Sequence, residues 1–219
     1  MSDSFFGQSG NADVASKFNA IRFLIRQLIG KVRTGVPVKI IAVHGGGVGP
    51  PPTVDVQPVV NQIDGVMKST SHGVVYGIPV TRNQGGASAV INDPVVGDVG
   101  HMVIADRDIS SLKNNAGAPS NPSSFRRHHL SDGVYHAAML NKTAPTDYIY
   151  HLPGGGFQIH DRFGNDILMN SSGITITTQL LQVNGPIQAT GEIVSMNTGT
   201  NIHLTTHTHS AGPPPDPGS

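Results

Sequence analysis

"GGGFQIHDRFGNDILMNSSGITITTQLLQVNGPIQATGEIVSMNTGTNIHLTTHTH", residues 154–209, is built of short runs in which apolar and polar side chains alternate. Each run lasts about five residues and ends at a turn rich in Gly, Asn or Ser, which is the pattern of short β-strands. One side of these strands is polar and uncharged. The other is apolar and is formed by Ile174, Ile176, Leu181, Val183, Ile187, Ile193 and Met196. Strands this short bury little within one chain, so we expect them to bury their apolar side against further copies.

The scarcity of charge in this stretch leads to the same expectation. Between Phe163 and Pro215 the only acidic or basic residues are Asp166 and Glu192. A soluble monomer seldom presents so little charge to water, so the segment is either disordered or largely buried against copies of itself. The alternation is too regular for disorder and favours a fibrous β-helix in which several chains wind round a common axis. An ordinary β-meander packed on the preceding domain is the alternative.

The residues before this stretch predict a small barrel. Period-two alternation with Gly- and Pro-rich turns gives five candidate strands, at residues 36–44, 52–60, 74–82, 87–96 and 100–108. Five short strands of this kind favour an OB-like barrel. Its closing hairpin is expected over residues 92–110, with the turn at Gly97 and Asp98.

A helix is predicted from Asn11 to Val32, with Asn11 as its N-cap. Apolar residues recur at steps of three and four, namely Val14, Phe18, Ile21, Leu24 or Ile25, and Leu28. Gly30 and Gly35 follow as helix-ending residues. The apolar side of this helix either packs on its own domain or docks on a partner or a sister chain.

The chain is therefore expected to have few helices and to be organised in five consecutive parts. The parts are a helical segment at 1–35, the OB-like barrel at 36–112, a linker or collar at 113–150, the β-helix shaft at 151–200 and a tip at 201–219. The linker or collar contains R-R-H-H at residues 126–129, which we interpret as a solvated loop.

Composition excludes several classes of protein. In 219 residues, 14 Lys and Arg stand against 14 Asp and Glu. The chain thus has no excess of positive charge for phosphates, and we expect no nucleic-acid partner. It has no Cys, which rules out disulfides and thiolate metal sites. The start lacks the features of a secretory signal, and Arg22 and Arg26 interrupt the longest apolar run, so we expect no membrane span and folding in a cytoplasm.

Three histidines near the end of the chain are candidate metal ligands: His203, His207 and His209. Residues two apart on a strand point the same way, so His207 and His209 share a face, and imidazole nitrogen is a common metal donor. If three chains meet on an axis here, six imidazoles surround one point. Six nitrogen donors describe an octahedral site, which suits Fe(II), Ni(II) or Co(II) better than four-coordinate zinc. Such a closed site would clamp the chain ends.

Two patterns resemble enzyme sites. A single-chain zinc site of His203, His207 and His209 would leave an open position for hydrolysis, but only Asp166 and Glu192 are available nearby as a general base. H-G-G-G at residues 44–47 matches an oxyanion-hole signature of lipases. The chain contains no G-x-S-x-G elbow, so we interpret this glycine run as a turn between strands of the barrel.

The order of these parts resembles a known family. The N-terminal helix, the barrel that ends in "GDVGHMVIADRDIS", the polar β segment and the terminal "HTHS" before Pro and Gly residues are similar to the central spike, or membrane-piercing baseplate protein, of contractile-tailed bacteriophages such as phage Mu. The resemblance covers nearly the whole chain. The barrel-closing segment and the H-x-H tip are its most specific elements.

The resemblance implies a homotrimer with a barrel collar, an intertwined triple-stranded β-helix and a pointed apex. In that family the H-x-H histidines of three chains bind one iron ion, and these positions correspond to His207 and His209 here, while His203 lies outside the motif. The family is not enzymatic. It lies at the tip of the tail baseplate in the virion, attaches to hub proteins through its N-terminal region and pierces the host outer membrane. The proline-rich end, residues 211–219, departs from the family pattern.

Two other functions stay open. A trimeric receptor-binding tail fibre would use the same β architecture to adhere, and it would be expected to expose aromatic side chains, which make up only 5% of the chain. A hydrolase would need either the single-chain zinc site or a further domain with paired carboxylates, for which the chain offers no room.

Overall fold

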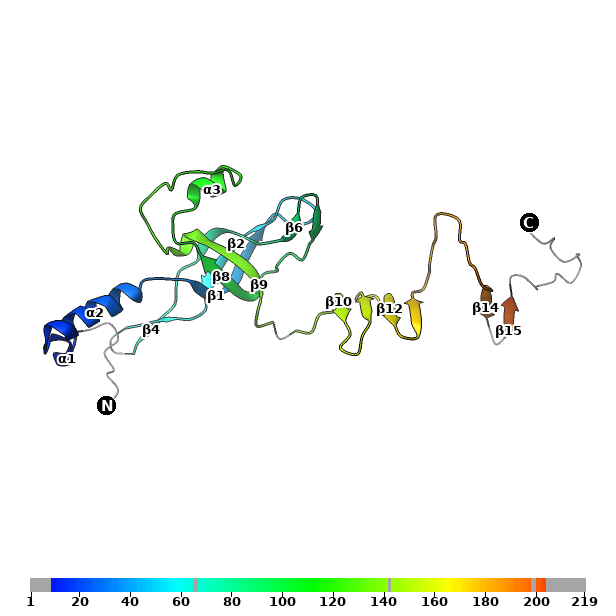
Figure 1. Cartoon of the computed structure of the whole chain (residues 1–219), viewed down its shortest axis with the longest axis horizontal. Helices are drawn as coiled ribbons and strands as arrows, with labels where there is room; N and C mark the ends of the chain where they lie inside the picture. Colours follow the sequence, from blue (N-terminus) through cyan, green and yellow to red (C-terminus); the bar gives the residue numbers. More distant parts are fainter. Residues whose placement is uncertain (1–8, 65–66, 142, 198–199, 204–219) are drawn as a thin grey trace, which may run out of the picture. The chain divides into compact units, whose positions relative to one another are not determined.

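The computed structural model describes residues 9–64, 67–141, 143–197 and 200–203. These residues form mostly β-strands with few helices, which confirms the expected fold class at this level (Figure 1). The chain divides into two compact units, of which the first ends at Ala144 and the second starts at Pro145. Each unit is described by itself below.

The N-terminal segment forms two helices, α1 (Asn11–Val14) and α2 (Lys17–Ile29), where one was predicted. The break lies at Ser16, whose extended backbone (φ −154°) starts a new helix and whose Oγ accepts a hydrogen bond from the Asn19 N–H at 3.2 Å. This is an N-cap arrangement. Gly30 ends α2 as predicted. The apolar residues of the predicted stripe are 49% exposed or more, so the helices bury little of it against their own chain.

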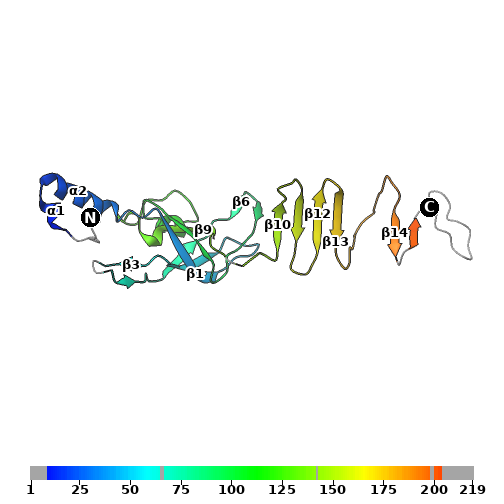
Figure 2. The same ribbon diagram turned by 90° about the horizontal axis from the view of Figure 1, so that it is seen from below.

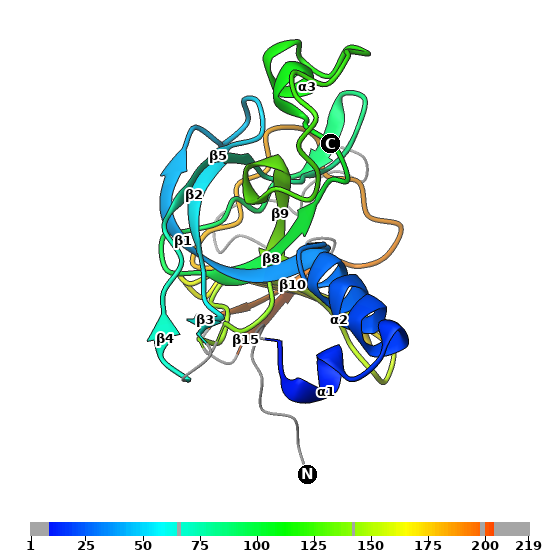
Figure 3. The ribbon, with the colours of Figure 1, turned by 90° about the vertical axis from the view of Figure 1, so that its left-hand side faces the viewer.

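A five-stranded antiparallel sheet forms the centre of the first unit, in the order β5-β2-β1-β8-β9. Four of its strands coincide with predicted runs to within one residue at the start or lie inside them: β1 (Gly35–His44), β2 (Thr53–Pro58), β5 (Val75–Pro79) and β8 (Val99–Ile104). The sheet is strongly curled, as the view in Figure 3 shows. Its edge strands approach each other at a parallel bridge between Val80 and Tyr135, where the Thr81 N–H donates to the Tyr135 carbonyl at 3.0 Å.

The inner face of this sheet supplies the core. Alternate residues of β2 are buried, as expected when one face of a sheet packs inward. The buried apolar residues are Val38, Ile40, Val54, Val56, Ile78, Met102, Ile104 and Tyr135. Gly100 lies under the Tyr135 ring, because a Cβ at this glycine would meet the tyrosine Oη at 2.3 Å.

The prediction of the fourth strand, over residues 87–96, was wrong. Residues 87–96 contribute only β7 (Ser88–Val90), which pairs with β6 (Asn83–Gly85) in a separate hairpin. Residues 91–98 leave the strand, because Asp93 turns its carboxylate toward Arg82 and Gly47, and Pro94 has no N–H to donate. The predicted turn at Gly97 is present, with φ of 101°. The sheet is completed instead by β9 (Gly133–Ala138), which pairs with β8.

The chain between β8 and β9 contains the short helix α3 (Ser110–Asn114) and the 3-10 turn η1 (Leu130–Asp132). We call residues 105–132, which connect the two strands, the collar loop (Figure 1). Two further short strands, β3 (Gln62–Ile63) and β4 (Ser69–Thr70), pair elsewhere in this unit.

The second unit contains a four-stranded antiparallel sheet whose strands follow chain order (Figure 2). They are β10 (Tyr148–His151), β11 (Phe157–His160), β12 (Asp166–Asn170) and β13 (Gly173–Thr177). A second pair follows, β14 (Val194–Asn197) with β15 (Thr200–His203). Of the alternating stretch described above, residues 157–160, 166–170 and 173–177 are thus strands, whereas residues 180–190 contain none. The hydrogen bonds join consecutive strands of one chain, so β10–β13 form an antiparallel meander, and no β-helix is seen among the described residues.

Candidate functional site

The predicted metal ligands lie at the end of the chain. His207 and His209 are outside the described residues, and so is most of the tip at 201–219. His203 ends β15 and stands opposite Val194 in the ladder. Within the described ranges, no group of three or more His, Asp or Glu side chains could hold a metal ion. The iron site and the rival zinc site both therefore stay predictions.

The sheet β10–β13 lines up one isoleucine from each strand. Ile149 stands opposite Ile159, Ile159 opposite Ile167, and Ile167 opposite Ile176. Directly paired residues of an antiparallel ladder lie on the same face of the sheet. We call this row the isoleucine ladder. Its side chains are 61%, 39%, 36% and 48% exposed in chain order, so one chain leaves the ladder only partly covered.

A second row on the same face is also mostly apolar. His151, Phe157, Met169 and Ile174 are paired across the four strands, and each lies two residues from its ladder neighbour, which places both rows on one face. The Phe157 ring contacts His151 edge to face, with the centroids 5.2 Å apart. This face carries no Asp, Glu, Lys or Arg.

The opposite face carries most of the polar residues of the sheet, together with Tyr148, Tyr150 and Leu168. Asp166 accepts hydrogen bonds from Gln158 Nε2 at 2.6 Å and stands 3.1 Å from His160 Nδ1, through its Oδ1 atom. His160 also stacks on Tyr148, with the ring centroids 5.0 Å apart. Thr175 and Thr177 lie on the same face of β13. The sheet thus places its Ile, Phe and Met residues on one face and most of its polar residues on the other, where Leu168 pairs with Gln158 and Thr175.

Three charged side chains of this unit, Asp147, Asp161 and Arg162, lie at the turns. Arg162 binds Asp147 through Nε at 2.8 Å, and its hydrogen bonds lower the pKa of Asp147 to about 2. Asp161 caps the β11–β12 turn by accepting from the N–H groups of Phe163 and Asn165. These hydrogen bonds stabilise the turns and do not involve side chains on the two faces of the sheet.

No residue between positions 145 and 194 is buried in the single chain. The apolar side chains there include several that are mostly in water, and the most exposed are Phe163 at 81%, Leu180 at 75%, Ile187 at 69% and Ile174 at 67%. Burial of apolar area is the main favourable term in folding. The second unit consequently has no hydrophobic core of its own among its described residues.

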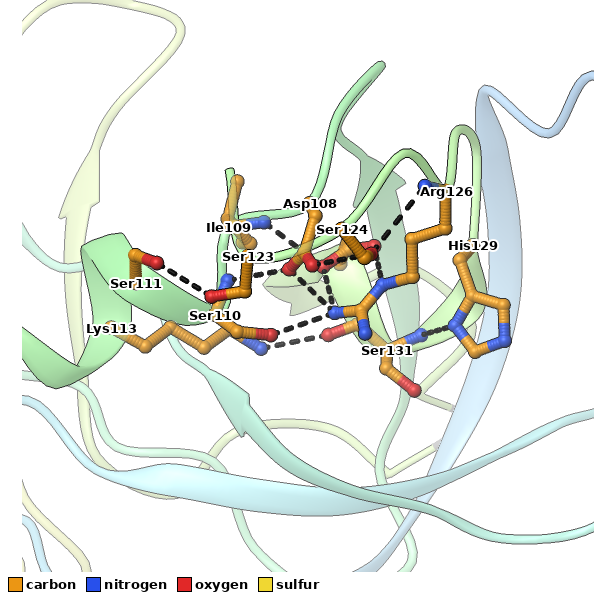
Figure 4. Close-up of polar contacts among 11 residues, drawn as sticks. Asp108, Ile109, Ser110, Ser111, Lys113, Ser123, Ser124, Arg126, His129 and Ser131 are labelled. Carbon is orange, nitrogen blue, oxygen red and sulfur yellow. Dashed lines mark hydrogen bonds and ion pairs between the residues drawn. The ribbon is translucent and has the colours of Figure 1, made fainter. Parts of the chain in front are cut away.

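A second candidate site is the ion-pair network of the collar loop (Figure 4). Arg126 Nη2 donates to Asp108 Oδ1 at 2.7 Å and to Asp132 Oδ1 at 2.8 Å, while its Nε donates to Asp132 Oδ2 at 2.8 Å. The carboxylates are 0% and 1% exposed, and Arg126 is 35% exposed. The sequence-based interpretation of R-R-H-H as a solvated loop is therefore wrong for Arg126, because two buried carboxylates need its charge.

Further hydrogen bonds tie the collar loop to this network. Ser124 Oγ donates to Asp108 Oδ2 at 2.7 Å, and the Ile109 N–H donates to Asp132 Oδ1 at 3.0 Å. Lys113 Nζ reaches the Ser131 carbonyl at 2.8 Å, and burial lowers the pKa of this lysine. The arrangement fixes the loop and has no evident chemical role. One sequence signal for it is Asp132, which lies between Leu130 and Val134.

The network makes a testable prediction for acid pH. Hydrogen bonds from Ser124 and from the Ser110 N–H lower the pKa of Asp108 below its ordinary 3.8. Burial raises the pKa of Asp132, but hydrogen bonds from Arg126 and the Ile109 N–H outweigh it and leave that pKa lowered as well. Both groups therefore stabilise the fold above pH 3.8, and this stability is lost as the pH falls through their folded pKa values. Carbon-13 NMR titration of both carboxyls should give midpoints below 3.8. A midpoint at or above 3.8 for either would contradict the network.

The H-G-G-G run lies in the loop between β1 and β2, as predicted. Gly45, Gly46 and Gly47 have φ values of 81°, 114° and 72°, which glycine adopts readily. The N–H of Gly47 donates to Asp93, and Arg82 donates to the Gly47 carbonyl at 3.1 Å. Asp93 and Arg82, which belong to the same unit, thus already bind backbone groups of this loop.

Comparison with known proteins gives no match, either to a protein family or to a curated protein. A search of the described helices for one that is both long and apolar enough to cross a membrane also finds none.

Proposed function

We propose that the chain is the central spike of a contractile phage tail: a homotrimer that pierces the host outer membrane. One observation carries this proposal most directly, which is that residues 145–194 contain no buried side chain although they are rich in Ile, Leu and Val. A segment of regular strands with no core of its own is expected in a protein whose core forms between chains.

The first unit fits the collar of such a spike. Its strand order β5-β2-β1-β8-β9, with a parallel contact between the two edge strands, supports an OB-like barrel. The exposed apolar side of α2 supports attachment of the N-terminal region to a hub protein of the baseplate. Lys17, Arg22 and Arg26 give this helix positive charge, and it carries no Asp or Glu.

The second unit fits the shaft. Charged side chains cost about 2–4 kcal/mol each at the midplane of a membrane barrel's lipid face, and between Phe163 and Pro215 the chain offers only Asp166 and Glu192. Of these two, Asp166 is held by Gln158 and His160. A nearly uncharged shaft would cross a bilayer at low cost, and hydrogen-bonded strands would keep it stiff.

The tip would be closed by a metal ion. His207 and His209 of three copies would supply six imidazole nitrogens, a donor set that suits an octahedral iron ion, with Ni(II) or Co(II) as other candidates. Bound metal would hold together three chain ends that would otherwise fray under load. On this proposal the protein catalyses no reaction.

Native mass spectrometry with elemental analysis tests this function. We expect a species of three chains with one iron ion. Replacing both His207 and His209 by Ala should remove the metal and leave the mass at three chains, because the apex contributes only part of the assembly. A monomer, or one metal ion per chain, would favour the single-chain zinc site instead and would overturn the proposal.

A second candidate is a trimeric receptor-binding tail fibre. Exposed aromatic side chains favour it: Phe125 is 103% exposed, Phe163 is 81% exposed and Tyr76 is 72% exposed. Aromatic side chains are common anchors of binding surfaces. A receptor-binding trimer would adsorb to intact host cells as the isolated protein, whereas a spike driven by sheath contraction would not need to.

A further inference from the structure

We infer that the isoleucine-ladder face of the sheet β10–β13 is the surface that three copies of this chain bury against one another, with each copy contributing one complete sheet. The inference rests on the proposed function for the number of copies. The inference adds two points to that function. It states which face of the sheet lies inside the shaft, and it states that each of the three sheets around the shaft axis is formed by a single chain.

The two faces differ enough to fix their orientation. The ladder face presents Ile149, Ile159, Ile167 and Ile176, flanked by the row that contains Phe157, Met169 and Ile174. The opposite face holds the Asp166 carboxylate, which would be costly to bury without its polar neighbours. Burial of apolar area contributes about 25 cal/mol per Å², so covering the ladder face is the favourable choice.

The spacing of the ladder indicates a copy of the same chain as the occupant. The row repeats one isoleucine at each strand, and adjacent strands lie about 4.8 Å apart. A surface with that period is matched along its whole length by another surface with the same period, and a second copy presents one. Within the four strands this face also carries no Asp, Glu, Lys or Arg, so copies meet there without like-charge repulsion.

The hydrogen bonds show why each wall belongs to one chain. All four strands pair with their neighbours in sequence, through β10–β11, β11–β12 and β12–β13 ladders. The backbone groups inside the sheet are thus already satisfied within the chain. The copies can therefore contact one another through the side chains of the ladder face. We expect this contact rather than an exchange of strands between chains.

Single cysteines test the inference in a chain that has none of its own. Ile159→Cys lies on the ladder face, and Gln158→Cys is its matched control, one residue away on the opposite face of β11. In the full-length assembly, we expect maleimide to label Ile159→Cys at least about tenfold more slowly than Gln158→Cys, because the buried site must open first. A short bis-maleimide should join at most two of the three chains through Ile159→Cys.

The outcomes separate the inference from the proposed function. A monomeric mass for the unmodified chain overturns both. A three-chain mass with rapid labelling of Ile159→Cys, or with protection of Gln158→Cys instead, overturns the face assignment alone. The pair Ile149→Cys and Tyr150→Cys on β10 repeats the measurement if Ile159→Cys fails to fold, and it carries the same expected and opposing results.

Discussion

Ile167→Asp is expected to abolish assembly of the three-copy shaft. Ile167 is the third member of the isoleucine ladder, between Ile159 and Ile176, and it is the least exposed of the four at 36%. In the proposed assembly, three aspartates would be buried on a face without a cation. Each unpaired buried charge costs several kcal/mol, so the concentration needed to form the trimer should rise by more than about a thousandfold.

Sedimentation velocity across a dilution series measures this effect. Thr175→Asp is the matched control, because it adds the same charge to the opposite face of the neighbouring strand, and Thr175 is exposed. The control should remain a trimer at concentrations where Ile167→Asp sediments as a single chain. If both variants sediment as trimers, the ladder face is not the contact between copies.

Arg126→Ala is expected to destabilise the first unit strongly. Its removal leaves Asp108 and Asp132 buried with no Arg126 cation to pair with them. Breaking a buried pair in this way costs about 3–5 kcal/mol. Because Arg126 is itself 35% exposed, we expect the low end of that general range, which corresponds to a fall of about 10 °C in the unfolding temperature of a unit this size.

Thermal unfolding followed by circular dichroism measures this change, with Arg127→Ala as the control. Arg127 is the exposed neighbour in the same loop, and its removal should change the unfolding temperature by no more than about 2 °C. Equal shifts for the two variants would mean that the loop is held by something other than the Arg126 network.

Local patterns predicted most strands of both units, because period-two alternation reports directly on which side of a strand is covered. They failed for β9. Its pairing with β8 spans the collar loop, and nothing local in Gly133–Ala138 distinguishes it from the run at 87–96. That run was assigned to the sheet on its valines, but Pro94 and the contacts of Asp93 draw it away. Tertiary partners decide such cases, since strand propensity depends on what covers the strand.

The candidate sites were predictable to different degrees. The apolar side of the second unit could be recognised in the sequence, but the alignment of Ile149, Ile159, Ile167 and Ile176 depends on turn lengths. The Ser171–Ser172 turn, for example, pairs Asn170 with Gly173, and Gly173 has a φ of 131°. For the Arg126 network, Asp132 was the one local signal. The pairing with Asp108 could not be predicted, because Asp108 lies 18 positions from Arg126 and the two residues meet only once the collar loop folds back.

The meander of β10–β13 has a geometric consequence for how such a chain can change in evolution. Each strand adds about 4.8 Å in the direction of the hydrogen bonds and is only four or five residues long. Insertion of one hairpin would therefore lengthen the sheet, and with it the proposed shaft, by about 10 Å and leave the width of the sheet unaltered. The length and the width of the proposed shaft would thus change independently in evolution. Duplication of a short repeat could match the length to the depth of a cell envelope.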